Sequence, residues 1–206
     1  SKNTSLFSKY DKIILGKIKE AIMYLLIISD IHGSNYYTDL FLERLKIEKP
    51  DKIILLGDLY YHGPRNPLPK DYNPMQVCEK LNSLKDSLIC IKGNCDAEVD
   101  ETISSFEFHS SYTLTISNKK FFFTHGQKYN IDNIPPNIDV LVYGHFHTGF
   151  IKEKDDVICV NAGSISLPKN DTKHSYLIID EKMITLKDLL NGEIIAKKYL
   201  KEEEYD

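Results

Sequence analysis

Three short apolar runs in the first half of the chain constrain the fold most strongly. They are YLLIISD (24–30), DKIILLGD (51–58) and LICIKGN (88–94), and each ends in a polar residue. Continuous β-branched runs of this length are typical of strands buried on both faces of a sheet. Apolar residues recur at helical spacing between them, over 34–49, with Ser34 as the expected cap, and over 73–86. The alternation predicts a parallel sheet with right-handed crossovers.

The second half of the chain is richer in strand patterns. A hairpin is predicted within YTLTISNKKFFFTHG, turning at Asn118 and Lys119. Further strands are expected in three segments, 139–145, 149–160 and 174–200. Late strands after early strand–helix units predict an α/β fold of two packed mixed β-sheets flanked by helices.

Length and composition predict a single domain. The chain has 206 residues, of which 42% are hydrophobic and 27% charged, enough for one substantial core and too few for two large ones. We assign residues 23–206 to that domain and interpret residues 1–22 as an N-terminal extension that need not belong to the native protein. No apolar run approaches the roughly 20 residues that a membrane span requires.

Charge and cysteine usage narrow the function classes. A formal net charge of -4 gives no reason to expect binding to nucleic acid or to an anionic membrane, so an anionic substrate would need a local positive centre. The four cysteines form no C-x-x-C motif, and we interpret them as the reduced thiols of a cytoplasmic protein.

Polar side chains follow five of the predicted strands, at the carboxyl ends where open parallel sheets bind ligands. Taken singly, each has an ordinary explanation, since an aspartate after a strand is usually a turn or cap residue. Taken together, carboxylates, imidazoles and an amide suit Mn²⁺, Fe²⁺, Zn²⁺ or a mixed pair of ions. Asp58 could bridge two cations through its carboxylate. The seven candidate ligands are Asp30, His32, Asp58, Asn94, His125, His145 and His147.

The order of these motifs resembles that of the calcineurin-like metallophosphoesterases. D-x-H, G-D, G-N, H-G and G-H-x-H occur in this order, and the resemblance runs from about Met23 to Leu200. More narrowly, SDIHGS, HGPRNPLP, GNCDAEVD and GSISLPK are similar to the small bacterial YfcE-type phosphodiesterases. The resemblance implies a first metal at Asp30, His32 and His147, a second at Asn94, His125 and His145, and Asp58 between the two.

The resemblance also implies an activity, which is hydrolysis of a small phosphate diester by metal-activated water. We expect two divalent ions, Mn²⁺ first and Zn²⁺, Fe²⁺ or Ni²⁺ as alternatives, and a homo-oligomer, either a dimer or a tetramer. The implied catalytic residues are Asp58, Asn94, Cys95 and His125. Cys95 stands where many members carry a histidine thought to protonate the leaving group, and Phe146 where the family often has threonine. A thiol is the poorer proton donor, so we expect activated or aryl diesters to be preferred.

One long irregular segment, 59–74, contains four prolines and is a candidate functional loop. His62 and Arg65 within it are candidates to contact the nonreacting part of a substrate, Arg65 by a forked contact to phosphate. They could equally form an exposed loop tip or an oligomer contact. Asp96 is interpreted as a turn or cap residue, with orientation of a neighbouring side chain as the second reading.

Two other functions stay open. One is a phosphomonoesterase or phosphatase of the same fold. The other is a non-catalytic scaffold that keeps the fold without the metals, which the seven filled ligand positions disfavour. Metal analysis together with turnover of a bis-aryl phosphate separates these alternatives.

Overall fold

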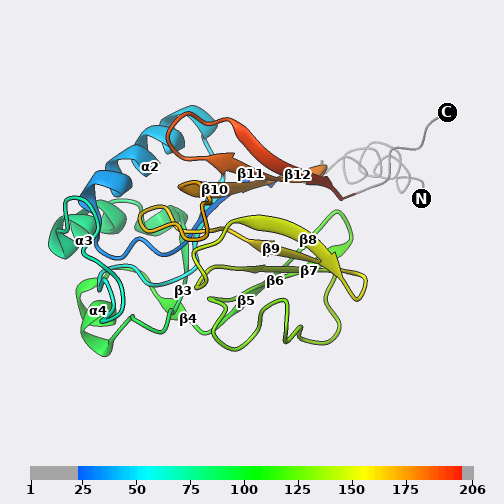
Figure 1. The fold of residues 1–206 in the computed structure, drawn as a ribbon, viewed down its shortest axis with the longest axis horizontal. Coiled ribbons are helices and arrows are strands. Elements are labelled where there is room, and N and C mark those ends of the chain that lie inside the picture. The colour runs from blue at the N-terminus through cyan, green and yellow to red at the C-terminus, as the bar shows by residue number, and fades with distance from the viewer. Residues whose placement is uncertain (1–22, 201–206) are drawn as a thin grey trace, which may run out of the picture.

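The computed structural model describes residues 23–200, which form two β-sheets packed face to face (Figure 1). One sheet has seven strands in the order β12-β11-β10-β1-β2-β3-β4, and the other has five in the order β5-β6-β7-β9-β8. Both sheets are mixed, as the sequence predicted. The proposed extension, 1–22, lies outside the described residues.

The seven-stranded sheet joins early and late parts of the chain. Its early strands run parallel to one another, as the alternation of strands and helices predicted. They are β1 (Leu25–Ile28), β2 (Lys52–Leu55), β3 (Leu88–Ile91) and β4 (Phe108–His109). A late antiparallel meander continues the sheet from β1, and it consists of β10 (Ser175–Ile179), β11 (Met183–Asp188) and β12 (Ile194–Tyr199).

The five-stranded sheet consists of β5 (Tyr112–Ile116), β6 (Lys119–Phe123), β7 (Val140–Tyr143), β8 (Phe150–Lys154) and β9 (Val157–Asn161). The predicted hairpin forms between β5 and β6, but its turn lies one residue earlier than expected. Ser117 and Asn118 occupy the turn with φ of 51° and 62°, and Lys119 already belongs to β6. A two-residue hairpin turn in which both residues have positive φ matches the twist of the strands. Asparagine adopts this conformation readily, whereas a lysine paired in a strand has negative φ.

The helices lie beside the seven-stranded sheet. They are α2 (Asn35–Glu48), α3 (Pro74–Asn82), the short 3-10 helix η2 (Lys85–Ser87) and α4 (Glu98–Ile103). Ser34 caps α2 by accepting a hydrogen bond from the backbone N–H of Tyr37, as predicted. The second predicted helix, over 73–86, is divided in the structure: α3 ends at Asn82, and the short η2 follows it. The sequence did not predict α4. Six residues with one outward valine give no amphipathic pattern to recognise.

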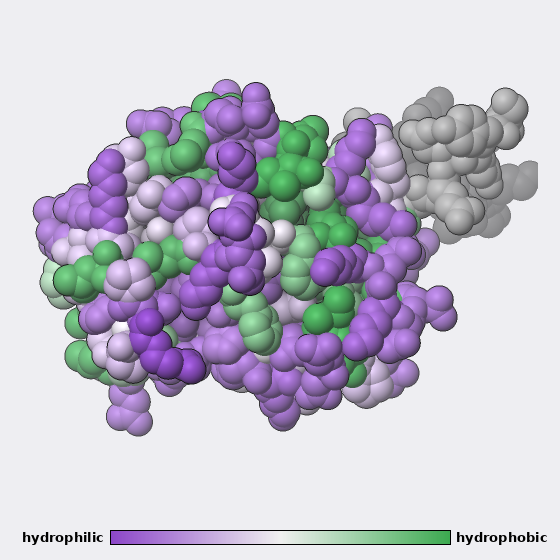
Figure 2. All heavy atoms as spheres, viewed as in Figure 1, coloured by the Kyte–Doolittle hydropathy of each residue, from purple (hydrophilic) through white to green (hydrophobic). Residues whose placement is uncertain are grey.

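Successive side chains along each strand point alternately into the core between the two sheets and to the outer face of their own sheet. Leu25 and Ile27 of β1 face the other sheet and belong to one core cluster with Phe121 and Phe123 of β6. The alternate residues of β1 face α2 and α3 on the outside. A loop over 131–138, rather than a helix, packs on the outer face of the five-stranded sheet. The face drawn in Figure 2 is mostly hydrophilic with separate apolar patches, as expected when the apolar side chains fill these layers.

Within residues 23–200, no helix combines the length and the apolar character needed to cross a bilayer.

Candidate metal centre

The seven candidate ligands come from five loops, each of which follows a strand, and the fold brings them to one edge of the two sheets. Five of the seven hold a left-handed backbone conformation that non-glycine residues rarely adopt. They are Asp30 (φ 55°), His32 (φ 50°), Asp58 (φ 57°), His145 (φ 64°) and His147 (φ 58°). Such conformations cost free energy and persist where the surroundings fix them, which is typical of functional sites.

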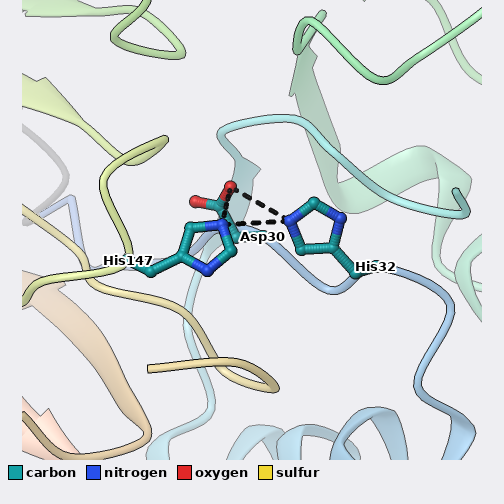
Figure 3. Close-up of side chains that lie close together, drawn as sticks. All are labelled: Asp30, His32 and His147. Atoms are coloured by element: carbon teal, nitrogen blue, oxygen red, sulfur yellow. Dashed lines mark hydrogen bonds and ion pairs between the residues drawn. The ribbon is translucent and has the colours of Figure 1, made fainter. Parts of the chain in front are cut away.

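Asp30, His32 and His147 form a first cluster in which the side chains point toward one another (Figure 3). Oδ1 of Asp30 lies 3.2 Å from Nε2 of His147 and 3.5 Å from Nε2 of His32. The two Nε2 atoms are 3.1 Å apart. All three residues are buried, and Oδ1 of Asp30 makes no hydrogen bond with any described residue. A buried acceptor without a donor is costly, so this atom fits a cation.

The far sides of the two rings determine which nitrogens are free. Nδ1 of His32 donates to the carbonyl oxygen of Tyr61 over 2.8 Å. Nδ1 of His147 donates to the carbonyl oxygen of Leu167 over 2.7 Å. Because a carbonyl only accepts, each Nδ1 carries a proton, and Nε2 is the ring nitrogen that faces Asp30 and that could bind a cation once it is unprotonated. Metal-binding histidines are oriented in this way.

A second cluster surrounds His125. Its Nε2 lies 3.1 Å from Oδ1 of Asn94, 3.2 Å from Nδ1 of His145 and 3.3 Å from Oδ2 of Asp58. Its Nδ1 donates to the carbonyl oxygen of Leu56 over 2.6 Å, so Nε2 is the ring nitrogen that faces the cluster and that would bind a cation on losing its proton. The oxygen and nitrogen donors of this cluster suit the same borderline divalent ions as those of the first.

Asp58 lies between the two clusters. Its Oδ2 atom, 3.3 Å from Nε2 of His125, is also 3.8 Å from Nε2 of His32. Its Oδ1 atom instead accepts a hydrogen bond from the backbone N–H of Cys95 over 2.8 Å. One oxygen atom therefore faces both sets of ligands, while the other fixes the orientation of the carboxylate.

The charges of the carboxylates make this pocket favourable for cations. Burial disfavours a charged imidazole at His125, but the hydrogen bond to Asp58 and the charges of Asp30 and Asp58 outweigh it and raise the pKa of His125 to about 9. Burial also opposes ionisation of Asp30, yet the adjacent imidazoles of His147 and His32 hold the pKa of its carboxyl well below the usual range. The pocket therefore stabilises positive charge.

Neighbouring side chains hold Asp30 in place. Its Oδ2 atom accepts hydrogen bonds from Oγ of Ser29 at 2.6 Å and from the backbone N–H of His145 at 2.9 Å. Its carbonyl oxygen accepts hydrogen bonds from the buried hydroxyls of Ser164 and Ser166, at 2.7 and 3.0 Å. These contacts fix both the backbone and one carboxylate oxygen, and leave Oδ1 directed at the imidazoles.

Asp96 joins two of the ligand-bearing loops. Its carboxylate accepts hydrogen bonds from the backbone N–H groups of Asp58, Leu59 and Gly93, at 2.8, 2.8 and 2.7 Å. Burial raises the pKa of Asp96 to about 6. All three donors are backbone groups, so the residue holds the backbone of the Asp58 loop, as a turn residue does.

A cleft of about 820 Å³ reaches both clusters. Its wall includes four ligand candidates and Cys95, together with residues of the proline-rich loop. The four are Asp58, Asn94, His145 and His147. Cys95 is one of four free cysteines in the described chain, and burial raises the pKa of its thiol to about 12. The loop predicted to be functional therefore borders the candidate metal centre.

The two substrate-contact candidates in that loop are placed differently. Arg65 lies in the cleft wall and is exposed. His62 is not among the residues of the wall, and its ring instead packs edge-on against Tyr61 and Tyr72. The wall also contains Lys169, which the sequence did not single out. A lone lysine after GSISLP carries no pattern of its own, and only the fold shows that it lies beside the cleft.

Comparison with known proteins agrees with this geometry. The family model for the calcineurin-like phosphoesterase superfamily domain matches residues 23–183. The chain belongs to this superfamily. It is a metal-dependent phosphoric ester hydrolase, as the sequence predicted.

The chain is similar over most of its length to proteins of known sequence and structure. It is 36% identical over 179 residues to phosphodiesterase YfcE of Escherichia coli K12, which covers 85% of this chain and 97% of the relative. The solved structure of YfcE, described as a phosphoesterase, matches with a TM-score of 0.84 at 34% identity, over 87% of this chain and 100% of the other. Vps29 of Cryptosporidium parvum shares the fold, with a TM-score of 0.60 at 18% identity over 88% and 99% of the two chains.

Proposed function

We propose that this chain is a binuclear metal-dependent phosphodiesterase that hydrolyses small phosphate diesters. The observation that carries the proposal is the convergence of oxygen and nitrogen ligands, in one buried cluster and one that opens to the cleft, around one carboxylate oxygen of Asp58. Similarity to a protein named a phosphodiesterase supports the choice of diesters. Two divalent ions, when bound, lower the pKa of water and neutralise charge on the phosphoryl oxygens. We propose Mn²⁺ as the ion, with Zn²⁺, Fe²⁺ or Ni²⁺ as alternatives.

The distances support a particular division of the ligands. Asp30, His32 and His147 lie together and would hold one ion. Asn94, His125 and His145 lie together and would hold the other, with Asp58 shared. This division explains why two histidines separated by a single residue are useful, because His145 offers Nδ1 to one cluster and His147 offers Nε2 to the other.

The chain itself provides the positive centre that an anionic substrate needs. Arg65 and Lys169 both line the cleft and are exposed. A guanidinium can bind two phosphoryl oxygens in a forked contact, whereas an ammonium acts as a point charge. We assign Arg65 to orientation of the phosphate group and Lys169 to attraction of the anion. Asp58, Asn94 and His125 remain proposed catalytic residues through their place at the ligand clusters.

The proposal is tested by loading the purified chain with each candidate ion and comparing a bis-aryl phosphate with the corresponding aryl monoester. We expect about two ions per chain and a higher kcat/KM for the diester. Preference for the monoester would identify a phosphomonoesterase, and absence of both metal and turnover would identify a scaffold. Either result would refute the diesterase.

Arg65→Ala is expected to raise KM for a diester about tenfold with little change in kcat. The reason is that a contact made equally in the ground state and the transition state contributes to binding alone. Steady-state kinetics of the metal-loaded protein measure the effect. Lys70→Ala is the matched control, because Lys70 belongs to the same loop but lies over the ring of Tyr36, 3.5 Å from its centroid. A fall in kcat with unchanged KM would contradict the assigned role.

Cys95→His is expected to raise kcat/KM for an aryl monoester, relative to the diester with the same leaving group, at least about tenfold. An imidazolium at this position in the cleft wall could protonate the leaving oxygen. A positioned general acid typically raises the reaction rate on the order of 100-fold or more. The measured quantity is the ratio of the two kcat/KM values in each protein. An unchanged ratio would mean that the thiol does not set the preference for diesters.

Other features of the chain support the expected setting. The net charge of -4 supports a small-molecule substrate rather than a nucleic acid. Four unpaired cysteines support a reducing compartment such as the cytoplasm. Assembly into a dimer or tetramer stays a prediction from the family resemblance, and gel filtration with light scattering tests it.

A further inference from the structure

Exposed aromatic side chains are rare on this protein, and two of them border the cleft. Within residues 23–200 the exposed aromatic residues are Tyr61, Phe146 and Tyr199, at 43%, 46% and 41% exposure. Tyr61 and Phe146 both line the cleft that reaches the metal-ligand candidates, and Tyr199 does not. They belong to different loops, one after β2 and one after β7. Exposed aromatic surface in a cleft is typical of a binding site.

The backbone of both residues is tied to the ligand loops. The carbonyl oxygen of Tyr61 accepts the hydrogen bond from Nδ1 of His32 over 2.8 Å. Phe146 stands between His145 and His147, and its N–H donates to the carbonyl oxygen of Gly144 over 2.7 Å. The backbone of neither aromatic residue can therefore move far without disturbing a proposed ligand.

Neither ring is stacked in parallel on another aromatic ring of the described residues. Phe146 meets Tyr143 and His145 at interplanar angles of 85° and 78°, in edge-to-face contacts. Tyr61 meets His62 at 68°, also edge to face. A planar aromatic group is the partner that such faces favour, because offset stacking adds to burial of apolar area.

We propose that Tyr61 and Phe146 bind a planar aromatic group, aryl or nucleobase, carried by one ester arm of the substrate. This inference rests on the proposed function and names its substrate class as diesters with an aromatic arm. Arg65 and Lys169 bind the phosphate in the same cleft, so the cleft recognises an anion and a ring together. A dialkyl diester would leave the two aromatic faces in water and bind more weakly.

The proposal is tested by calorimetric titration of the metal-loaded chain with three monoanionic phosphonates. Methyl methylphosphonate has no ring, methyl phenylphosphonate has an aryl group, and thymidine 5′-methylphosphonate has a nucleobase. At least one ring-bearing ligand is expected to bind about tenfold tighter than the first, as one stacking contact provides. The ligand that binds tighter identifies the source of the ring.

Three variants locate the effect. Phe146→Leu and Tyr61→Leu keep apolar bulk but remove the π face, and each is expected to reduce the preference for the ring to about threefold or less. Tyr199→Leu, equally exposed but outside the cleft, is expected to leave the preference unchanged. Equal affinity for all three ligands in the native chain, or a preference that survives both cleft variants, would overturn the inference. If diester turnover is absent while the ring preference is present, the proposed function fails and the aromatic site stands.

Discussion

Asp58→Asn is expected to lower kcat/KM for an aryl diester at least about 100-fold. Substitutions behind metal ligands typically cost 10- to 100-fold in affinity or activity, so loss of a shared ligand should reach or exceed the upper end of that range. The carboxylate oxygen that faces both His125 and His32 would become part of a neutral amide. An amide oxygen still accepts a hydrogen bond from Cys95, so the loop should keep its conformation. The loss should therefore appear in metal binding and chemistry rather than in folding.

Metal content, thermal stability and kinetics together test this expectation. We expect fewer than two ions per chain in the Asp58→Asn protein and an unchanged melting temperature in the absence of metal. Asp188→Asn is the matched control, because Asp188 is also buried but accepts the backbone N–H of Leu190 in a distant turn. Full activity with full metal content in Asp58→Asn would refute the bridging role and with it the binuclear centre.

The candidate metal ligands could be singled out because the sequence places them directly after recognisable strands. Asp30, Asp58 and Asn94 each end a continuous apolar run, and parallel strands present their carboxyl ends at the same edge of a sheet. That argument does not extend to Lys169, which follows no strand pattern. It lies beside the cleft because its backbone N–H donates to the carbonyl oxygen of His147. Such a contact between distant loops exists only in the folded chain.

Strand pairing set another limit to prediction from the sequence. The meander at the end of the chain was expected, but its place in the sheet was not. The register Leu26↔Ile178 joins residues from opposite ends of the domain. Periodicity indicates that both segments are strands, yet it contains no information about which strand each one meets. The pairing matters for function, because it holds the loop of Ser164 and Ser166 against the backbone of Asp30.

The sequence also could not show which aromatic residues line the cleft. The sequence showed Phe146 at a position where the family often has threonine. Its exposure and its place in the cleft wall became evident only in the fold. Tyr60 and Tyr61 are neighbours in the sequence, but Tyr60 is 2% exposed and Tyr61 is 43% exposed. Adjacent tyrosines in an irregular loop give no periodicity from which to assign one to the core and one to the cleft.

Gly144→Ala is expected to lower the free energy of unfolding by about 3 kcal/mol, the upper part of the range for overpacked sites. A Cβ at this position would overlap Oγ of Ser29 and lie 2.6 Å from Oδ2 of Asp30, so the loop after β1 or the loop of Gly144 must move. For a chain of this size, that loss corresponds to a fall of about 6–12 °C in Tm.

Gly149→Ala is the control, because its nearest contact would be 2.9 Å, to Oγ of Ser175, and we expect a loss of about 1 kcal/mol. Urea denaturation of both variants without metal measures these free energies, and equal losses would show that the contact with Asp30 is not what requires glycine. Displacement of Asp30 should also weaken metal binding in Gly144→Ala, whereas Gly149→Ala should retain it.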